Sequence, residues 1–449
     1  MALEAAVKGL TAQVDALKAA RDVGRVTDVT GGILHITGLS RQARIGNRLE
    51  IARPAHDPLM AEIVQLWGDT ILALPDAAPE GVGISDRATL LDTSDLAPCD
   101  TWVGRVIDPL GHPLDGRKLL RGPHICALRR APPDAAKRRA LGARLNTGLA
   151  VTNTLLPLVA GQRVGLFAGS GIGKSSLLGH LASHMQADIV VIALIGERGR
   201  EVRHFVDEVL GPEAMARSVV IAATSDKSAL VRRRCAWAAM TVAEHFRDQG
   251  KSVLLLADSI TRFAEAHREV AVAAGEPPVL RGHPPSTSSM IMSLCERAGP
   301  GVDGQGDITA IFTVLVAGSD MEEPIADILR GVLDGHIVLS REIAERGRYP
   351  AIDVLRSISR SLPTAASPSE NALIQQARQL LARYDRNETM IQAGLYTSGN
   401  DPELDKAIAA WPELDDFLVA AEHHDPDQSF QQLELLLRRA GSKTRKTAA

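Results

Sequence analysis

A glycine-rich stretch near the middle of the chain has residue types that bind phosphate groups. It consists of Gly169, Ser170, Gly171, Ile172, Gly173, Lys174, Ser175 and Ser176. An apolar run, Arg163–Ala168, precedes it, and a segment with a helical pattern follows it. Glycines let backbone N–H groups converge on phosphate oxygens, and the N-terminus of the following helix adds partial positive charge. We expect Lys174 to contact the β- and γ-phosphates of a nucleoside triphosphate and the Ser175 hydroxyl to bind Mg²⁺.

Two carboxylates follow other apolar runs. Asp258 ends the run Lys251–Ala257. Because ligands of open parallel sheets bind at the carboxyl ends of the strands, Asp258 is predicted to hold Mg²⁺ directly or through water. Glu197 follows the run Ile189–Ile195 after one glycine. Hydrolysis needs a carboxylate beside the attacking water. We assign that role to Glu197 and keep Glu201, one helical turn further on, as the alternative.

The elements that position these residues are apolar runs that alternate with helical segments. Runs this uniformly apolar are typical of strands buried on both faces, which predicts a parallel sheet between helices. The predicted strands are Arg163–Ala168, Asp188–Ile195, Ser218–Ala223, Ser252–Ala257, Ile308–Val316 and His336–Leu339. The stretch Thr101–Gly116 is dense in Gly and Pro and is predicted to be a connector of tight turns.

The flanking regions have different patterns. Between Gly24 and Leu96, short β-prone runs alternate with Gly, Asp and Pro turns, which indicates a small barrel or a sandwich. After Ser361 the pattern becomes helical, and the last residues are polar. The predicted helices there are Pro368–Ala393, Asp401–Trp411, Pro412–Ala421 and Asp427–Arg439.

The first 21 residues have a narrow apolar stripe at spacings of three and four. The stripe consists of Leu3, Val7, Leu10, Val14 and Leu17. This spacing predicts a helix with one apolar face. An isolated helix of this length is marginal, so the stripe favours docking on a partner helix, with packing on its own domain as the alternative.

Residues 117–144 are strongly basic. Nine Lys or Arg residues accompany one acid, Asp134, and Pro132 and Pro133 interrupt the stretch. A solvated linker is the simplest interpretation, because no aromatic residues are interleaved as in a nucleic-acid surface. A contact with an anionic surface or with another subunit is the alternative.

The composition excludes several classes of protein. The chain has 449 residues, of which 45% are hydrophobic and 23% charged, as expected for a protein with a large buried core. A net charge of −4 and 3% aromatic residues argue against a dedicated nucleic-acid binder. The longest apolar run, Ile189–Ile195, is much shorter than the roughly 20 residues of a membrane span. Without a signal-peptide pattern or a CxxC pair, we expect a cytoplasmic protein with free thiols.

Five stretches of sequence resemble a known family. They are GSGIGKS from Gly169, ALIGERGREVR from Ala193, LLLADSITRFAEAHRE from Leu254, AAGEPP from Ala273, and residues 322–360. They closely resemble the flagellum-specific ATPase of the bacterial type III export apparatus. That family is similar to the virulence secretion ATPases and, more distantly, to the catalytic beta subunit of rotary ATP synthases. The resemblance extends from about Gly24 to Leu418.

The residue patterns and the resemblance together imply a division of the chain into domains. A partner-binding helix at 1–21 would precede a β-barrel at 22–98. A RecA-like α/β P-loop ATPase domain with a parallel sheet would follow at 99–360, with its entry linker at 99–160. A helical domain at 361–440 and a disordered tail at 441–449 would end the chain.

Several site residues follow from the resemblance alone. Arg198 would lie beside Glu197, and Arg262 near the γ-phosphate. Tyr349 matches the tyrosine that stacks on adenine in this class. Arg360 matches the arginine finger that contacts the nucleotide of a neighbouring subunit, which requires a ring. From spacing alone, Tyr349 would be a core residue and Arg360 part of a surface ion pair.

The family also implies cofactors and partners. ATP and Mg²⁺ would bind between the subunits of a homohexamer, which would be cytoplasmic and peripherally associated with the inner-membrane export apparatus. A stator-like regulator would bind the N-terminal helix, and a coiled-coil stalk would enter the ring. The export gate and chaperone–substrate complexes would dock on it, and no nucleic acid is expected. Residues 286–292 are richer in Ser and Met than the family's pattern, at the place expected to face the stalk.

We therefore predict a Mg-dependent ATP hydrolase that energises flagellar protein export. A virulence-type secretion ATPase with the same chemistry is the nearest alternative, and Glu322–Asp327 favours the flagellar branch. A non-catalytic nucleotide-binding ring subunit is a second alternative, but such subunits usually lack the carboxylate of Glu197. A hexameric RNA translocase is a third, against which the acidic charge balance argues.

Overall fold

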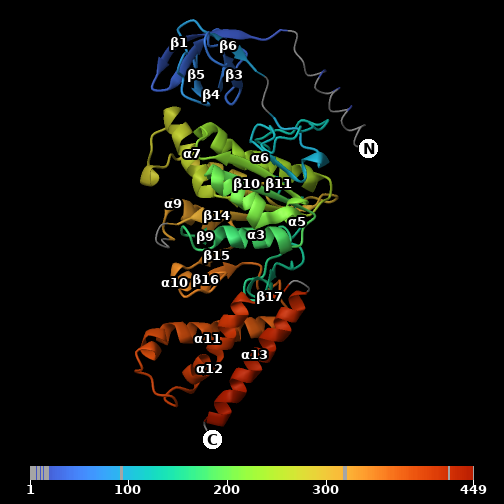
Figure 1. Cartoon of the computed structure of the whole chain (residues 1–449), viewed down its shortest axis with the longest axis vertical. Coiled ribbons are helices and arrows are strands. Elements are labelled where there is room, and N and C mark those ends of the chain that lie inside the picture. Colours follow the sequence, from blue (N-terminus) through green and yellow to red (C-terminus); the bar gives the residue numbers. More distant parts are fainter. Residues whose placement is uncertain are drawn as a thin grey trace.

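The computed structural model describes residues 20–91, 95–316, 321–422 and 425–447, together with Val7, Thr11 and Val14. A β-barrel, an α/β domain and a group of long helices follow one another along the long axis of the molecule (Figure 1). Most of the predicted N-terminal helix, 1–21, lies outside the described residues. Val7, Thr11 and Val14 are helical, and the side chains of Val7 and Val14 are exposed. None of the described helices has the length and apolar composition that a membrane crossing needs.

The N-terminal part is a closed barrel of six antiparallel strands in the order β1-β2-β5-β4-β3-β6. The strands are β1 (Val23–Thr30), β2 (Ile33–Thr37), β3 (Arg48–Ile51), β4 (Leu59–Trp67), β5 (Thr70–Pro75) and β6 (Arg87–Leu90). Alternate side chains, such as Leu34 and Ile36 of β2, are fully buried in the barrel, because the side-chain period of a strand is two. Of the two folds that the sequence left open, the structure has the barrel.

The central domain contains a sheet in the order β16-β15-β9-β14-β12-β10-β11-β7. Its strands are β7 (Arg105–Ile107), β9 (Arg163–Ala168), β10 (Ile189–Glu197), β11 (Ser218–Thr224), β12 (Val253–Asp258), β14 (Asp307–Leu315), β15 (Gly335–Leu339) and β16 (Ile352–Ser359), and β13 (Gly299–Pro300) pairs with β14. The strands from β15 to β7 are parallel, as predicted. Two details differ from the prediction: β16 and β13 are antiparallel to their neighbours, and β7 arises within the predicted connector Thr101–Gly116.

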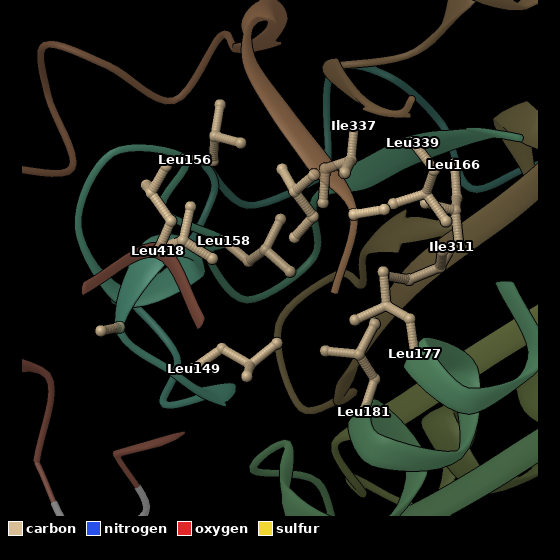
Figure 2. Packing of buried hydrophobic residues seen from close by; sticks show 14 of the residues in the cluster. Leu149, Leu156, Leu158, Leu166, Leu177, Leu181, Ile311, Ile337, Leu339 and Leu418 are labelled. Atoms are coloured by element: carbon tan, nitrogen blue, oxygen red, sulfur yellow. The ribbon is translucent and has the colours of Figure 1, made fainter. Parts of the chain in front are cut away.

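Helices cover both faces of this sheet. They are α3 (Lys174–His184), α4 (Gly199–His204), the π-helix η2 (Phe205–Leu210), α5 (Gly211–Met215), α6 (Ala229–Asp248), α7 (Ile260–Ala273), α8 (Ser286–Glu296), α9 (Pro324–Val332) and α10 (Arg341–Glu345), with 3₁₀ turns η1 (Asp100–Trp102) and η3 (Leu280–Gly282). On one face, Leu177 and Leu181 of α3 belong to the same buried cluster as Leu166 and Ile311 of the sheet (Figure 2). On the other face, Trp237 of α6 packs edge-on against Phe263 of α7.

The C-terminal part consists of three long helices, α11 (Pro368–Gln392), α12 (Pro402–Val419) and α13 (Pro426–Thr447). The short elements β8 (Gly148–Leu149) and α2 (Ala150–Asn153) connect it to the sheet, because β8 pairs with β17 (Ala421–Glu422). The sequence predicted two helices on either side of Pro412, but α12 is one helix that contains it. Helix α13 continues to Thr447, into the stretch predicted as a disordered tail.

The basic stretch 117–144 forms ion pairs with acids of both larger domains. Arg130 pairs with Asp248, Arg138 with Glu296, Arg139 with Asp307, and Arg144 with both Glu370 and Asp427. These contacts hold the segment on the surface of the α/β domain and tie Arg144 to helices α11 and α13. The interpretation as a solvated linker is wrong at Arg138 and Arg144, whose side chains are 15% exposed, whereas Arg130 and Arg139 stay 47% and 41% exposed.

Candidate functional site

The glycine-rich loop connects β9 to α3 at the carboxyl end of the parallel strands. Gly171 and Gly173 have φ of +78° and +86°, in the left-handed region that glycine adopts without strain. A Cβ on Gly173 would lie 3.1 Å from Cδ1 of Tyr349. The Tyr349 ring therefore lies against the last glycine of the loop, and it is 53% exposed. This placement leaves room for a planar group on the ring next to bound phosphates.

Lys174, the first residue of α3, forms an ion pair with Asp258, the last residue of β12. Asp258 Oδ1 also accepts a hydrogen bond of 2.7 Å from Thr313 Oγ1, on the intervening strand β14. The side chains of Lys174 and Asp258 are only 11% and 4% exposed, so each charge depends on the other for compensation. Phosphate oxygens would replace Asp258 as the partner of the ammonium group, and Mg²⁺ would replace Lys174 as the partner of the carboxylate.

The oxygen ligands at this edge of the sheet suit a Mg²⁺ ion that binds together with phosphate. Among the residues that the structure describes, no group of three or more His, Cys, Asp and Glu side chains could hold a metal ion. Mg²⁺ usually keeps several waters and takes one or two protein ligands besides phosphate oxygens. The exposed Ser175 and the Asp258 carboxylate meet that need. Ser176 is also exposed, whereas Ile172 is buried beneath the loop.

Glu197 is the last residue of β10 and lies at the same edge, since Leu194 of β10 pairs with Asp258 of β12. Burial, a hydrogen bond with Glu201 and the charge of Asp258 raise the pKa of Glu197 to about 7, against the opposing effect of Lys174. The hydrogen bond with Glu197 lowers the pKa of Glu201, and so does Arg198, which pairs with Glu201 at 3.1 Å. A carboxyl group with a pKa near neutrality is suited to accept a proton from water. Of the two carboxylates, Glu197 lies at the strand end near Asp258, whereas Glu201 is engaged with Arg198.

Two arginines flank Glu197. The Arg198 side chain is 68% exposed, and its contact is the pair with Glu201. Arg262, in the first turn of α7, pairs with Glu265 at 3.4 Å. A Cβ on Gly196 would lie 3.5 Å from the Cβ of Arg262, so Arg262 packs directly beside the end of β10. The structure therefore brings both arginines to the edge where Glu197 and Asp258 lie.

Arg360 is the predicted site residue that the structure does not bring to the loop. Its guanidinium donates to the Leu333 carbonyl at 3.1 Å, and its backbone N–H donates to the Asp334 carbonyl at 3.1 Å. Asp334 pairs with Arg163 at 3.0 Å, and Arg163 is the first residue of β9, whereas the loop follows the last. Six residues of strand span about 20 Å. The Arg360 side chain therefore lies at the edge of the sheet opposite to its own chain's phosphate loop.

Sequence reasoning missed two side chains at this edge. Thr313 is a polar residue within the apolar run of β14, which was the only signal that could have indicated it. Arg341, at the start of α10, donates from Nη2 to the Ser170 carbonyl at 3.4 Å. Nothing in the sequence near Arg341 indicates this contact, because it depends on how β15 packs beside β9.

Comparison with known proteins assigns the family. Residues 148–359 match the ATP synthase alpha/beta family, nucleotide-binding domain, and residues 366–434 match the T3SS EscN ATPase C-terminal domain. A flagellum-specific ATP synthase of Caulobacter vibrioides is 43% identical over 440 residues, which cover 96% of this chain and 99% of the relative. The chain belongs to the family of flagellar and type III secretion ATPases. We refer to this family as the export ATPases.

Members of both branches of the export ATPases are similar to the chain. A type 3 secretion system ATPase of Xanthomonas euvesicatoria is 41% identical over 411 residues, which cover 91% of this chain and 92% of the relative. The assembled ATPase EscN of enteropathogenic E. coli matches with a TM-score of 0.85 and 38% identity, over 92% of this chain and 100% of EscN. EscN in complex with its central stalk EscO matches with a TM-score of 0.84 and 37% identity, with the same coverage. As an export ATPase, the chain is a P-loop ATP hydrolase with the three-part fold predicted from its sequence.

Proposed function

We propose that this export ATPase hydrolyses Mg·ATP at the interfaces between subunits of a ring and thereby energises flagellar type III protein export. The observation that carries the proposal is the cluster at the carboxyl edge of the sheet. There the phosphate loop, the Lys174–Asp258 pair and Glu197 lie on adjacent elements. Groups that can bind phosphate, compensate its charge and activate water therefore lie together at this edge of the sheet.

Each side chain has a defined task in the proposed reaction. The loop N–H groups and Lys174 bind the β- and γ-phosphates, and the adenine base stacks on the ring of Tyr349. Mg²⁺, held by Ser175 and Asp258, would withdraw charge from the phosphate oxygens when bound. Glu197 accepts the proton of the attacking water, whose oxygen bonds to the γ-phosphorus as the bond to the bridging oxygen of ADP breaks.

Two further groups act on the charge that develops during this step. Arg262, beside Glu197, is placed to stabilise the γ-phosphoryl oxygens. Arg360 would do so for a neighbouring subunit, and its position at the opposite edge from its own loop supports this role in trans. The proposed assembly is a homohexamer, and the assembled form of the similar EscN supports an oligomer.

The proposed partners follow from the family and from the exposed surfaces. The complex of EscN with its stalk EscO supports a coiled-coil stalk protein for this chain. Val7 and Val14, 53% and 64% exposed, belong to the apolar stripe that we assign to a stator-like regulator. The other proposed partners are the membrane export gate and chaperone–substrate complexes. The ATPase would meet them at the cytoplasmic face of the inner membrane.

The flagellar branch is distinguished from the virulence branch by complementation. Expression of the chain in a bacterium that lacks its flagellar ATPase is expected to restore filament growth and swimming. Restored secretion of virulence proteins, without swimming, in a strain that lacks its secretion ATPase would assign the other branch. The Lys174→Ala variant is the matched control and should restore neither.

The enzymatic proposal is tested by phosphate release from Mg·ATP over a wide range of protein concentrations. Specific activity should rise steeply with concentration, because the nucleotide site needs two subunits. Glu197→Gln and Arg360→Ala should lose turnover and still bind nucleotide. A specific activity that is independent of concentration and survives Arg360→Ala would contradict the shared site. No turnover at any concentration would favour a non-catalytic ring subunit.

A further inference from the structure

A short connection between α10 and β16, residues 346–351, touches the phosphate loop on one side. Tyr349 lies in this connection and faces Gly173, where a Cβ would approach its ring to 3.1 Å. Arg341, at the start of α10, donates to the Ser170 carbonyl at 3.4 Å. The position of the Tyr349 ring relative to the loop is thus set by α10 and the connection.

The other side of the same connection is attached to the C-terminal helices by two ion pairs. Arg346 donates to both carboxylate oxygens of Glu388, on α11, at 2.6 and 3.0 Å. Arg348 donates to Asp415, on α12, at 2.8 Å and to the Ile352 carbonyl at 2.8 Å. Both arginines lie within the three residues that precede Tyr349, and each is tied to a different helix.

The two acids are aligned by a stacked pair of aromatic rings. The rings of Tyr384 on α11 and Trp411 on α12 lie 4.0 Å apart with an interplanar angle of 5°. Glu388 follows Tyr384 by four residues, and Asp415 follows Trp411 by four, which is about one helical turn in each case. The stack therefore fixes the two helices so that both carboxylates face the connection.

The junction between the connection and the helices is not closely packed. A cavity of about 410 Å³ lies there, and its lining includes Val354, Leu381, Leu418 and both ion pairs. Ala351, at the end of the connection, packs in the buried core, whereas Arg346 and Arg348 border the cavity, where the two ion pairs join the connection to the helices. A change in either pair should move the connection without opening the core of either domain.

We propose that Glu388 and Asp415 are positioning residues for the base of the nucleotide: through Arg346 and Arg348 they hold Tyr349 beside the phosphate loop. The inference rests on the proposed function, which places the base on Tyr349. It makes the C-terminal helices a determinant of nucleotide affinity, because they act on Tyr349 through the connection. The Arg348–Asp415 pair should matter more, because Arg348 is 10% exposed and Arg346 is 49% exposed.

The experiment compares ligands with and without a base. Affinities for ADP and for inorganic tripolyphosphate, both with Mg²⁺, are measured calorimetrically for the full chain and for Asp415→Asn, Glu388→Gln and Tyr349→Ala. We expect Asp415→Asn to weaken ADP binding about three- to tenfold, as the loss of a partly buried ion pair would. Tripolyphosphate affinity and the kcat for ATP should stay unchanged while KM for ATP rises.

Two controls separate positioning from damage to the fold. Arg383→Gln removes an ion pair with Asp401 that also joins α11 to α12 but lies away from the connection, and it should leave ADP affinity unchanged. The charge swap of Arg346→Glu with Glu388→Arg should restore the ADP affinity that Glu388→Gln loses.

Three results would overturn the inference. If Tyr349→Ala weakens ADP binding and Asp415→Asn does not, the positioning role fails while the proposed function stands. If tripolyphosphate binding weakens in parallel with ADP binding, the acids act on the loop or the fold and not on the base. If Tyr349→Ala leaves ADP affinity unchanged, the base is not on Tyr349, and the inference fails together with that part of the proposed function.

Discussion

Lys174 and Arg360 lie at opposite ends of strand β9. Lys174 follows the carboxyl end of the strand through the phosphate loop, and Arg360 is held near Asp334, which pairs with Arg163 at the amino end. The separation is about 20 Å along a strand of six residues. A mechanism that uses both side chains on one nucleotide therefore needs two copies of the chain. This relationship makes the subunit interface the place where the proposed ATPase activity arises.

Replacement of Glu197 separates binding from hydrolysis. Glu197→Gln keeps the size and polarity of the side chain and removes the base, so turnover should fall by about 10²- to 10⁴-fold. ADP affinity should change little, because the phosphate loop and Lys174 are untouched. Single-turnover phosphate release and equilibrium binding measure the two quantities. Equal activity of Glu197→Gln and wild type would exclude Glu197 as the base, and the same assay of Glu201→Gln would then test the alternative.

The raised pKa of Glu197 predicts a specific pH dependence. The carboxyl group must be ionised to accept a proton, so kcat/KM should fall as the pH is lowered through about 7. Glu201→Gln removes a negative charge that helps to raise this pKa, and the midpoint should move to lower pH. A profile that is flat between pH 6 and 8 in both proteins would contradict this role.

Gly173 should be required for binding more than for folding. Alanine at φ +86°, with its Cβ 3.1 Å from the Tyr349 ring, strains the loop and displaces the ring. The free energy of unfolding without ligand should fall by about 1–2 kcal/mol. Mg·ADP at 100 times its wild-type Kd stabilises a native protein by about 2.7 kcal/mol, and most of that increase should be absent in Gly173→Ala. Thermal unfolding with and without Mg·ADP measures both effects, and an unchanged ligand-induced shift would refute the prediction.

The buried ion pair between Arg297 and Glu244 should contribute far more to stability than exposed pairs. Both side chains are 2% exposed, and Glu244 accepts from Arg297 at 2.9 and 2.7 Å. Glu244→Ala leaves a buried guanidinium without its carboxylate and should cost about 3–5 kcal/mol. The exposed Glu434 of the Arg438–Glu434 pair is the control, and Glu434→Ala should cost at most about 1 kcal/mol. Similar losses in the two variants, measured by urea unfolding, would contradict this ranking.

The parts of the site that are local in sequence could be predicted from it. The loop from Gly169 to Gly173 is bounded by its own strand and helix, so its residues indicate phosphate binding without knowledge of the fold. Glu197 and Asp258 could also be predicted from local sequence, because each ends an apolar run. The carboxyl ends of parallel strands share one edge of the sheet, so the two residues were expected to lie together. The roles assigned to Tyr349 and Arg360 came from the family resemblance alone.

The parts that depend on pairing between distant segments could not be predicted. Strand β7 has only three residues and is a strand because β11 lies beside it. The partners of the basic stretch, such as Asp248 for Arg130, are more than 100 residues away. Pro412 does not end α12, because Ala410 and Leu414 on either side of it pack in the buried core, which the local pattern does not indicate.

The most direct test of the shared site mixes two inactive variants. Lys174→Ala has an intact arginine finger and Arg360→Ala has an intact phosphate loop, and each alone should lose about 10³-fold or more in turnover. After mixed rings form, roughly a quarter of the interfaces pair an intact loop with an intact finger, because each interface draws its two halves at random. Phosphate release should return in the mixture. Mixing either variant with the double variant should restore nothing. Mixed rings that remain as inactive as their separate components would contradict the account.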